Sequence, residues 1–234
     1  MSTTARVLLV GHGRMGQMVE RLAREYDCEI AGIVEVDSSP SLADGRSPAW
    51  GRVDVAIDFS LPEAVPVNLP ALARLGIDTV IGTTGWAAHE AELRAVATAA
   101  GIGVVAAPNF STGVVLFEAL VAQAAKLFAM QQDFGAWLHE AHHVHKKDAP
   151  SGTALQLRKT MEATGYPRPI DTSFTRAGHI PGTHTIGFDG PAESITLTHT
   201  ARDRSTFARG ALQAARWVQG RRGWFTMRDV LGLA

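Results

Sequence analysis

A glycine motif near the amino end constrains the fold of this chain more than any other feature. The short apolar run 6–10 leads directly into Gly11-His12-Gly13-Arg14-Met15-Gly16, and a helical pattern follows from Gln17. The order strand, G-x-G-x-x-G, helix is typical of dinucleotide-binding folds, whose glycines permit a tight turn and a close approach to pyrophosphate. A second apolar run, 29–34, ends just before Glu35, about where an acid meets the adenosine ribose. The alternative is a glycine turn that serves packing alone.

Strand-like and helical runs alternate through the first half of the chain. The alternation predicts an α/β fold, a Rossmann-like doubly wound parallel sheet with helices on both faces. Ligands of such sheets bind beside the carboxyl ends of the strands. Small or polar residues follow three of the runs, at Ser60, Thr83-Thr84-Gly85 and Pro108-Asn109-Phe110-Ser111. The expected strands are 53–59, 78–82 and 103–107, and the expected helices are 62–75 and 87–100.

The pattern changes after a predicted helix at 113–130. Strand candidates at 135–141, 170–176, 183–188 and 193–200, with one helix at 153–164, predict an α+β domain built on an open mixed sheet. Such a sheet can bury a second face on another subunit, so oligomerisation is expected. A helix at 205–218 is expected to return to the first domain. The predicted domains are 1–111 with 205–234, for dinucleotide binding, and 112–204, for substrate binding and oligomerisation.

The segment 139–153 gathers four of the nine histidines of the chain and two lysines. Imidazoles carry a proton near neutral pH and lysines hold anions, so the segment suits an acidic substrate that must be protonated. Residues 150–153, Pro-Ser-Gly-Thr, offer backbone N–H groups and hydroxyls, and a helix that begins there would attract a carboxylate. The segment therefore predicts an anion site with an acid beside it. The alternative is a solvated loop in which some histidines only fill space.

The same segment contains the zinc-protease pattern H-E-x-x-H at 139–143, with Glu162 downstream. That pattern binds zinc on a helix, where residues i and i+4 share a face. Here Phe134-Gly135-Ala136-Trp137-Leu138 precedes it and Pro150 follows soon after, which favours a strand running into a loop. A strand holds His139 and His143 too far apart for one zinc ion. We therefore expect no metal site.

Composition excludes other classes of function. The formal net charge of −1 gives no general attraction to nucleic acid or to a membrane, and no run of 18 apolar residues is present. The first five residues lack the charged and apolar regions of a secretory signal, so a cytoplasmic protein is expected. The one cysteine, Cys28, has no partner for an internal disulfide and is expected to be buried rather than catalytic.

Taken together, the motifs resemble those of the dihydrodipicolinate reductases, also called 4-hydroxy-tetrahydrodipicolinate reductases. The resemblance implies the diaminopimelate route to lysine, a homotetramer assembled through the second domain, and reduction of a cyclic dicarboxylate to tetrahydrodipicolinate by NADH or NADPH. It spans nearly the whole chain. The motifs are the glycine loop 11–16, Asp58-Phe59-Ser60, Gly82-Thr83-Thr84-Gly85, Pro108-Asn109-Phe110-Ser111, the block 140–153 and Phe207-Ala208-Arg209-Gly210-Ala211.

The resemblance also implies roles for single residues. His142 would be the acid and base that protonates the substrate ring, with Lys146 as a second proton donor. A substrate carboxylate would be held by His143, Ser151, Gly152 and Thr153. The cofactor would contact Gly11, His12, Gly13, Arg14, Met15, Gly16, Glu35, Gly82, Thr83, Thr84, Ala107, Pro108, Asn109 and Phe110.

Two departures from the family pattern concern the cofactor. The glycine loop is one residue shorter than in many members, and Val36 and Asp37 stand where an arginine often serves the extra phosphate of NADPH. We therefore expect NADH to be preferred and NADPH to be used less well. Arg14, or Ser38 with Ser39, could instead serve that phosphate.

Two other classes of protein share parts of the pattern. An amino-acid or aldehyde dehydrogenase would keep the first domain but would not need the histidine and lysine segment. A redox sensor without catalysis would bind the dinucleotide and lack a proton donor. Turnover of the cyclic substrate distinguishes these classes.

Overall fold

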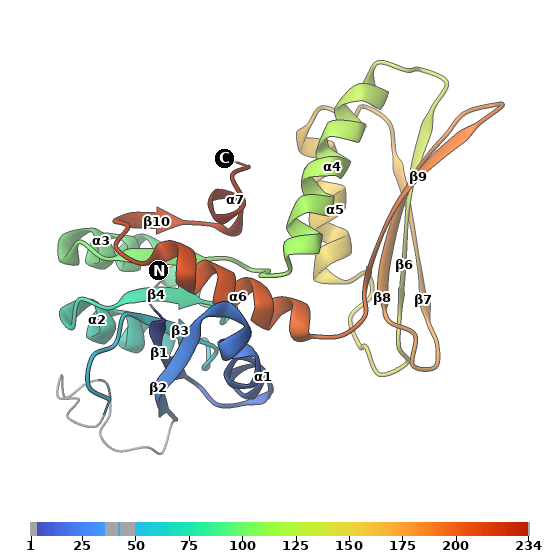
Figure 1. Ribbon diagram of the computed structural model, residues 1–234. Coiled ribbons are helices and arrows are strands. Elements are labelled where there is room, and N and C mark those ends of the chain that lie inside the picture. The colour runs from blue at the N-terminus through green and yellow to red at the C-terminus, as the bar shows by residue number, and fades with distance from the viewer. Residues whose placement is uncertain (1–3, 36–41, 43–49, 234) are drawn as a thin grey trace. The chain divides into compact units, whose positions relative to one another are not determined.

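A computed structural model describes residues 4–35, 42 and 50–233 of the chain (Figure 1). The chain divides into two compact units. The first comprises Met1–Thr112 and Arg204–Ala234, and the second comprises Gly113–Asp203. The second unit is thus inserted between two parts of the first, and each unit has its own sheet.

The first unit is built on a sheet of six parallel strands in the order β10-β5-β4-β3-β1-β2. The chain moves from β1 to β2 on one side and then crosses to β3 on the other side of β1. This reversal is the topological switch point at which doubly wound sheets bind ligands. The strands are β1 (Ala5–Val10), β2 (Cys28–Val34), β3 (Val55–Asp58), β4 (Asp78–Ile81), β5 (Gly103–Ala106) and β10 (Gly223–Phe225).

Helices cover both faces of this sheet, as predicted (Figure 1). One face carries α1 (Arg14–Leu22) and α6 (Ser205–Val218), which pack against each other. The opposite face carries α2 (Val65–Arg74) and α3 (Glu90–Ala100) over a core that includes Leu69, Leu93 and Val104. The helix expected at 87–100 begins as a 3-10 turn, Ala87–His89, before α3.

The short strand β10 and the helix α7 (Met227–Val230) were not predicted. Both are shorter than the windows over which periodicity can be read. The side chain of Thr226 accepts the N–H of Arg228, and Asp229 accepts the N–H of Thr226 at 2.7 Å, a reciprocal cap that begins α7. Trp224 of β10 packs edge-to-face on Trp86, so this strand completes the core on the α2 and α3 face.

The second unit is built on an open mixed sheet, as predicted, and its strands lie in the order β7-β6-β8-β9. Strand β6 pairs with β7 in parallel and with β8 antiparallel, and β8 pairs antiparallel with β9. The helices α4 and α5 lie against one face of the sheet (Figure 1). The elements are α4 (Thr112–Ala129), β6 (Gly135–His142), α5 (Gly152–Ala163), β7 (Ile170–Arg176), β8 (Gly182–Asp189) and β9 (Ser194–Ala201).

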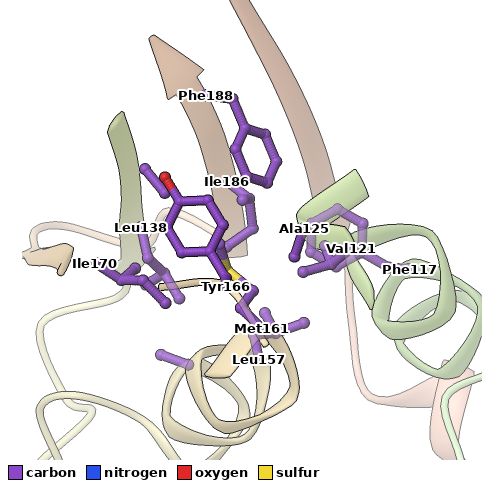
Figure 2. Close-up of a cluster of buried hydrophobic side chains, with 12 residues drawn as sticks. Phe117, Val121, Ala125, Leu138, Leu157, Met161, Tyr166, Ile170, Ile186 and Phe188 are labelled. Carbon is purple, nitrogen blue, oxygen red and sulfur yellow. The ribbon is translucent and has the colours of Figure 1, made fainter. Parts of the chain in front are cut away.

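The core of the second unit lies between these helices and the sheet. Figure 2 shows Leu138, Ile186 and Phe188 of the strands directed toward Val121 of α4 and Met161 of α5. Alternate residues of a strand point to opposite faces. The residues of β6 in phase with Leu138 are Ala136, Glu140 and His142, so two ionisable side chains continue an apolar inner face.

The helix α4 is long and apolar enough to cross a membrane by length and composition alone, and it is the one described helix that meets this test. Three of its residues, Phe117, Val121 and Ala125, are buried in the core of the second unit. The apolar character of α4 is therefore accounted for in part by packing within the protein.

Candidate functional site

The glycine loop after β1 has the geometry that pyrophosphate binding requires. Gly11 has φ +91°, and a Cβ there would come within 2.6 Å of the Phe59 carbonyl oxygen. A Cβ on Gly16 would overlap the carbonyl oxygen of Gly11. A Cβ on Gly13 would meet nothing within 4 Å, so the middle glycine leaves open space at the amino end of α1. Backbone N–H groups at such a helix end attract phosphate.

His12 connects this loop to the acid that follows β2. Its Nε2 atom lies 2.7 Å from Oε2 of Glu20, and its Nδ1 atom lies 3.9 Å from Oε1 of Glu35. Glu35 is exposed at the carboxyl end of β2, where an acid can accept hydrogen bonds from a ribose. Val36 and Asp37, on which the expected cofactor preference depends, lie outside the described residues.

Asp58, at the carboxyl end of β3, fixes two loops at the sheet edge where ligands are expected. Only 1% of it is exposed. Its carboxylate accepts the N–H and hydroxyl of Ser60 at 2.8 and 2.6 Å and the hydroxyl of Thr83 at 3.0 Å. Asn68 of α2 donates to its other oxygen at 3.0 Å. A single buried carboxylate therefore positions the loops after β3 and β4 relative to each other.

The loop after β5 is held by α6. Phe110 is buried, and a Cβ on Gly210 would overlap its carbonyl oxygen. The hydroxyls of Ser111 and Thr206 lie 2.8 Å apart. The motif Phe207–Ala211 thus supports the predicted cofactor loop from behind. Around these contacts Thr84 and Pro108 are exposed, Gly82 and Asn109 are half-buried, and Ala107 is buried.

The second unit places the predicted substrate residues around the start of α5. Ser151 is the N-cap of this helix and its hydroxyl accepts the N–H of Ala154 at 3.2 Å. Ser151 is 2% exposed and its own N–H already donates to Glu140 at 2.9 Å. Gly152 is exposed and Thr153 is half-buried, so these two residues are the accessible part of the helix amino end. A carboxylate is stabilised there by the helix dipole.

The two predicted proton donors lie at the end of β6 and in the loop that follows. His142 is the last residue of β6 and its side chain is 13% exposed. The ammonium of Lys146 donates to Asp148 at 2.8 and 3.0 Å, and this hydrogen bond lowers the pKa of Asp148. The Nδ1 atom of His143 is buried and has no hydrogen-bond partner among the described residues. These three side chains belong to the second unit, whereas every predicted cofactor residue belongs to the first.

Three residues of the site were missed by the sequence analysis: Glu140, Arg176 and His184. Glu140 is fully buried on β6, and its Oε1 atom accepts from Arg176 at 2.5 Å. His184 of β8 lies with its Nε2 atom 3.4 Å from Oε2 of Glu140 and 3.2 Å from the hydroxyl of Ser151. Arg176 also donates to the carbonyl of Asp148 at 2.7 Å, which fixes the loop that carries Lys146.

Burial and charge shift the titration of this cluster in opposite directions. Burial would raise the pKa of Glu140, but hydrogen bonds from Arg176 and Ser151 outweigh it and the pKa is lowered. Burial lowers the pKa of His142, and the carboxylate of Glu140 opposes that shift. Burial also lowers the pKa of His184 to about 4, so this ring is neutral near pH 7. A buried anion thus lies beside a neutral ring and a ring that can take up a proton.

The zinc-protease pattern is not on a helix. It lies at the end of β6, as predicted, and His139 points to the outer face of the sheet, where its Nδ1 atom is 2.9 Å from the hydroxyl of Ser173. A different set, Glu140, His142 and His184, has three possible ligand atoms within 4.8 Å of one another. The guanidinium of Arg176 binds the same carboxylate and would repel a divalent ion. This donor set therefore fits a proton network better than a metal site.

Comparison with known proteins assigns both units to one family. The family model for the amino-terminal part of dihydrodipicolinate reductase matches residues 5–110, and the model for its carboxyl-terminal part matches residues 113–231. A 4-hydroxy-tetrahydrodipicolinate reductase of Thiobacillus denitrificans is 38% identical over 268 residues, covering 98% of this chain and 99% of the relative. One of Stenotrophomonas maltophilia is 42% identical over 241 residues, covering 98% of each.

A solved structure gives the same assignment of fold. The dipicolinate-bound dihydrodipicolinate reductase of Paenisporosarcina sp. TG-14 superposes with a TM-score of 0.79 at 23% identity, covering 97% of this chain and 99% of that one. A probable dehydrogenase of Thermotoga maritima superposes less closely, with a TM-score of 0.61 at 10% identity. The two-unit fold is therefore shared with a dihydrodipicolinate reductase and, less closely, with a probable dehydrogenase.

Proposed function

The chain belongs to the dihydrodipicolinate reductase family, and we propose that it reduces 4-hydroxy-tetrahydrodipicolinate to tetrahydrodipicolinate in the diaminopimelate route to lysine. The net reaction takes up one hydride and one proton and releases one water. The observation that carries the proposal is the match of both family models, in chain order, over nearly the whole chain. The buried acid and base cluster beside an open helix amino end in the second unit supports it.

The first unit would hold NADH or NADPH, which supplies the hydride. The N–H groups at the amino end of α1 would bind the pyrophosphate, with Gly13 permitting its close approach. Glu35 would accept hydrogen bonds from the adenosine ribose. The loops fixed by Asp58 and α6, which contain Thr83 and Phe110, would form the nicotinamide side. On this basis NADH is the preferred cofactor and NADPH the weaker one.

The second unit would hold the substrate and supply the proton. A carboxylate of the ring would bind at Gly152 and Thr153, with the imidazole of His143 beside it. Hydride addition leaves negative charge on the ring, and His142 would neutralise it by donating a proton. Lys146 would add a positive charge that stabilises the developing anion and would serve as a second donor.

The outer face of the second sheet supports assembly of a homotetramer. No described helix covers this face (Figure 1), which carries Trp137 on β6 and threonine pairs across β8 and β9. The hydroxyls of Thr185 and Thr198 lie 3.1 Å apart, and those of Thr183 and Thr200 also lie 3.1 Å apart. Hydroxyl groups that are already paired with each other can be buried on a second copy at small cost.

Oxidation of NADH in the presence of the cyclic substrate tests the proposed activity. The substrate is generated in the cuvette by the synthase that precedes this step, and the loss of NADH absorbance is followed. We expect turnover that depends on the synthase and on both of its substrates. Loss of NADH absorbance at the same rate without the synthase would exclude the cyclic dicarboxylate as the substrate.

A further inference from the structure

Glu140 is a buried carboxylate with two oxygens in different surroundings. It lies on the inner face of β6, directly across from His184 of β8, and it is 0% exposed. Its Oε1 atom accepts two donors, the N–H of Ser151 at 2.9 Å and a guanidinium nitrogen of Arg176 at 2.5 Å. A backbone N–H and a guanidinium can only donate hydrogen bonds, so both require an acceptor at the Oε1 position. These two hydrogen bonds therefore fix the orientation of the carboxylate.

The second oxygen of Glu140 faces two imidazole nitrogens. Its distance to Nε2 of His142 is 3.5 Å, and its distance to Nε2 of His184 is 3.4 Å. Oε2 of Glu140 and Nε2 of His142 are both fully buried, and neither has a hydrogen-bond partner among the described residues. Catalytic hydrogen bonds are often long in an unoccupied site and tighten when the substrate binds. The two atoms that lack partners therefore complement each other.

We propose that Glu140 is a positioning residue that holds the Nε2 proton of His142 and thereby makes Nδ1 the nitrogen that exchanges a proton with the substrate. The inference deepens the proposed function and rests on it for the role of His142. In a neutral imidazole one nitrogen carries the proton, and the partner of that nitrogen selects the tautomer. With Nε2–H directed at Glu140, Nδ1 is an acceptor in the neutral ring and a donor in the protonated ring.

Gly182 supports this assignment from the neighbouring strand. A Cβ at this position would lie 2.9 Å from Cε1 and 3.0 Å from Nδ1 of His142, closer than side chains approach one another. The absence of a side chain at Gly182 therefore lets the ring of His142 pack closely on β8, and any side chain there would press on its Cε1–Nδ1 edge. Glu140 thus borders the imidazole at Nε2, whereas Gly182 lies nearest to Cε1 and Nδ1.

The charges around His142 make Glu140 the group that favours its protonated form. Burial lowers the pKa of His142 most strongly, and Glu140 raises it. Among the described residues, the other charged or titratable groups that act on the ring lower its pKa or are neutral. These groups are Lys146 and His143 in the following loop, Arg176 on β7 and His184 on β8. Removing the negative charge of Glu140 must therefore lower the pKa of His142 further.

Glu140→Gln tests the proposal because the donors around Oε1 dictate how the new amide must lie. Ser151 and Arg176 both donate at the Oε1 position, so the amide oxygen must occupy it. The amide NH₂ then takes the place of Oε2 and points its hydrogens at Nε2 of His142. Nε2 becomes an acceptor, and the proton of the neutral ring moves to Nδ1. The substitution reverses the tautomer while conserving the volume of the side chain.

The first readout needs no substrate. Nitrogen-15 chemical shifts of histidine-labelled protein should show the Nε2–H tautomer of neutral His142 in the parent and the Nδ1–H tautomer in Glu140→Gln. An Nδ1–H tautomer in the parent would overturn the proposal even if the variant did not fold. Because the measurement is made on the free protein, it can fail while the reductase activity is confirmed, and the reverse also holds.

The second readout is the pH profile of turnover. Activity that needs protonated His142 falls as pH rises through its pKa, so the alkaline limb of kcat/KM should move to lower pH in Glu140→Gln. We also expect kcat to fall by about tenfold or more with KM little changed, because a correctly placed acid contributes about 10²–10⁴-fold. Glu162→Gln is the matched control, because it makes the same change at an exposed ion pair with Arg158 on α5. It should change neither the alkaline limb of kcat/KM nor kcat. If the alkaline limb of kcat/KM is at the same pH in Glu140→Gln as in the parent, Glu140 has only a structural role.

Gly182→Ala provides a variant that leaves the carboxylate in place. Its added methyl group presses on the Nδ1 edge of His142 and should lower kcat with the alkaline limb unmoved. Gly135→Ala is the matched control, because a Cβ there meets only the Asp189 carbonyl oxygen at 4.0 Å. A kcat for Gly182→Ala equal to that of the control would count against Nδ1 as the reacting nitrogen.

Discussion

His142 belongs to the second unit, whereas the loops expected to hold the dinucleotide belong to the first. His142→Gln should therefore leave NADH affinity near that of the parent and reduce turnover by about 10²–10⁴-fold, since that is the usual cost of losing a positioned acid. Fluorescence titration with NADH and steady-state kinetics measure the two quantities separately. Turnover within a few-fold of the parent would remove His142 from the mechanism.

The preference between NADH and NADPH depends on single charges that follow β2. Glu35 accepts hydrogen bonds from a free ribose hydroxyl and repels a 2′-phosphate, and Asp37 adds charge of the same sign. Because exposed charges are screened, we expect kcat/KM to favour NADH by roughly five- to thirtyfold, about 1–2 kcal/mol. Val36→Arg should reduce the difference in kcat/KM between NADH and NADPH, because arginine can bind the 2′-phosphate with two hydrogen bonds. Equal values in the parent at fixed ionic strength would show that Arg14 or the nearby serines bind the phosphate.

His184 makes the stability of the second unit depend on pH. Burial lowers its pKa from 6.5 to about 4, so the unfolded chain binds a proton over a range where the folded one does not. The stabilisation is complete above pH 6.5 and is lost as pH falls from 6.5 toward 4. The loss should reach on the order of 3 kcal/mol for this ring. Denaturant unfolding between pH 4 and 6.5 measures the free energy of unfolding, and in His184→Gln this free energy should depend less steeply on pH. An unchanged slope would assign the effect to other groups.

At the scale of elements, α6 holds the cofactor loop in part through the close approach of Gly210 to Phe110. Alanine favours a helix over glycine by about 0.8–1.0 kcal/mol, so Gly210→Ala would stabilise an isolated α6. A Cβ at Gly210 would instead overlap the carbonyl oxygen of Phe110. We expect the overlap to dominate, with a lower melting temperature and weaker NADH binding. Calorimetry with and without NADH measures both, and a raised melting temperature would show that α6 can shift without cost.

Local patterns in the sequence predicted most strands and helices of both units, because each element of sufficient length carries its own hydrophobic periodicity. The site was predicted less completely. His142 and Ser151 lie in one short stretch of sequence, but Arg176 and His184 reach Glu140 only through the register of β6 with β7 and β8. Register depends on contacts between distant segments, which one sequence does not reveal. Glu140 itself was detectable, since it lies in phase with Ala136 and Leu138 on an otherwise apolar face.

At the scale of the whole molecule, the outer face of the second sheet should decide the oligomeric state. Thr185→Arg would place a charge at the centre of that face, next to Thr198. We expect the parent to sediment at four times the mass of the chain and the variant at a lower mass, with the circular dichroism spectrum retained. Thr98→Arg, on an exposed position of α3 in the first unit, should leave the mass unchanged. Equal masses for parent and Thr185→Arg would place the interface elsewhere.

The insertion of one unit into the other determines the order in which the parts can mature during synthesis. The helix α6, which packs on α1 and on three strands of the first sheet, is made only after the whole of the second unit. Domains fold as units while the chain is being synthesised. The dinucleotide unit, although it comes first, must wait with one sheet face covered by α1 alone until residue 218 has left the ribosome. A nascent chain from which residues up to 204 have left the ribosome, while α6 is still inside it, should therefore contain a folded second unit and should not yet retain NADH.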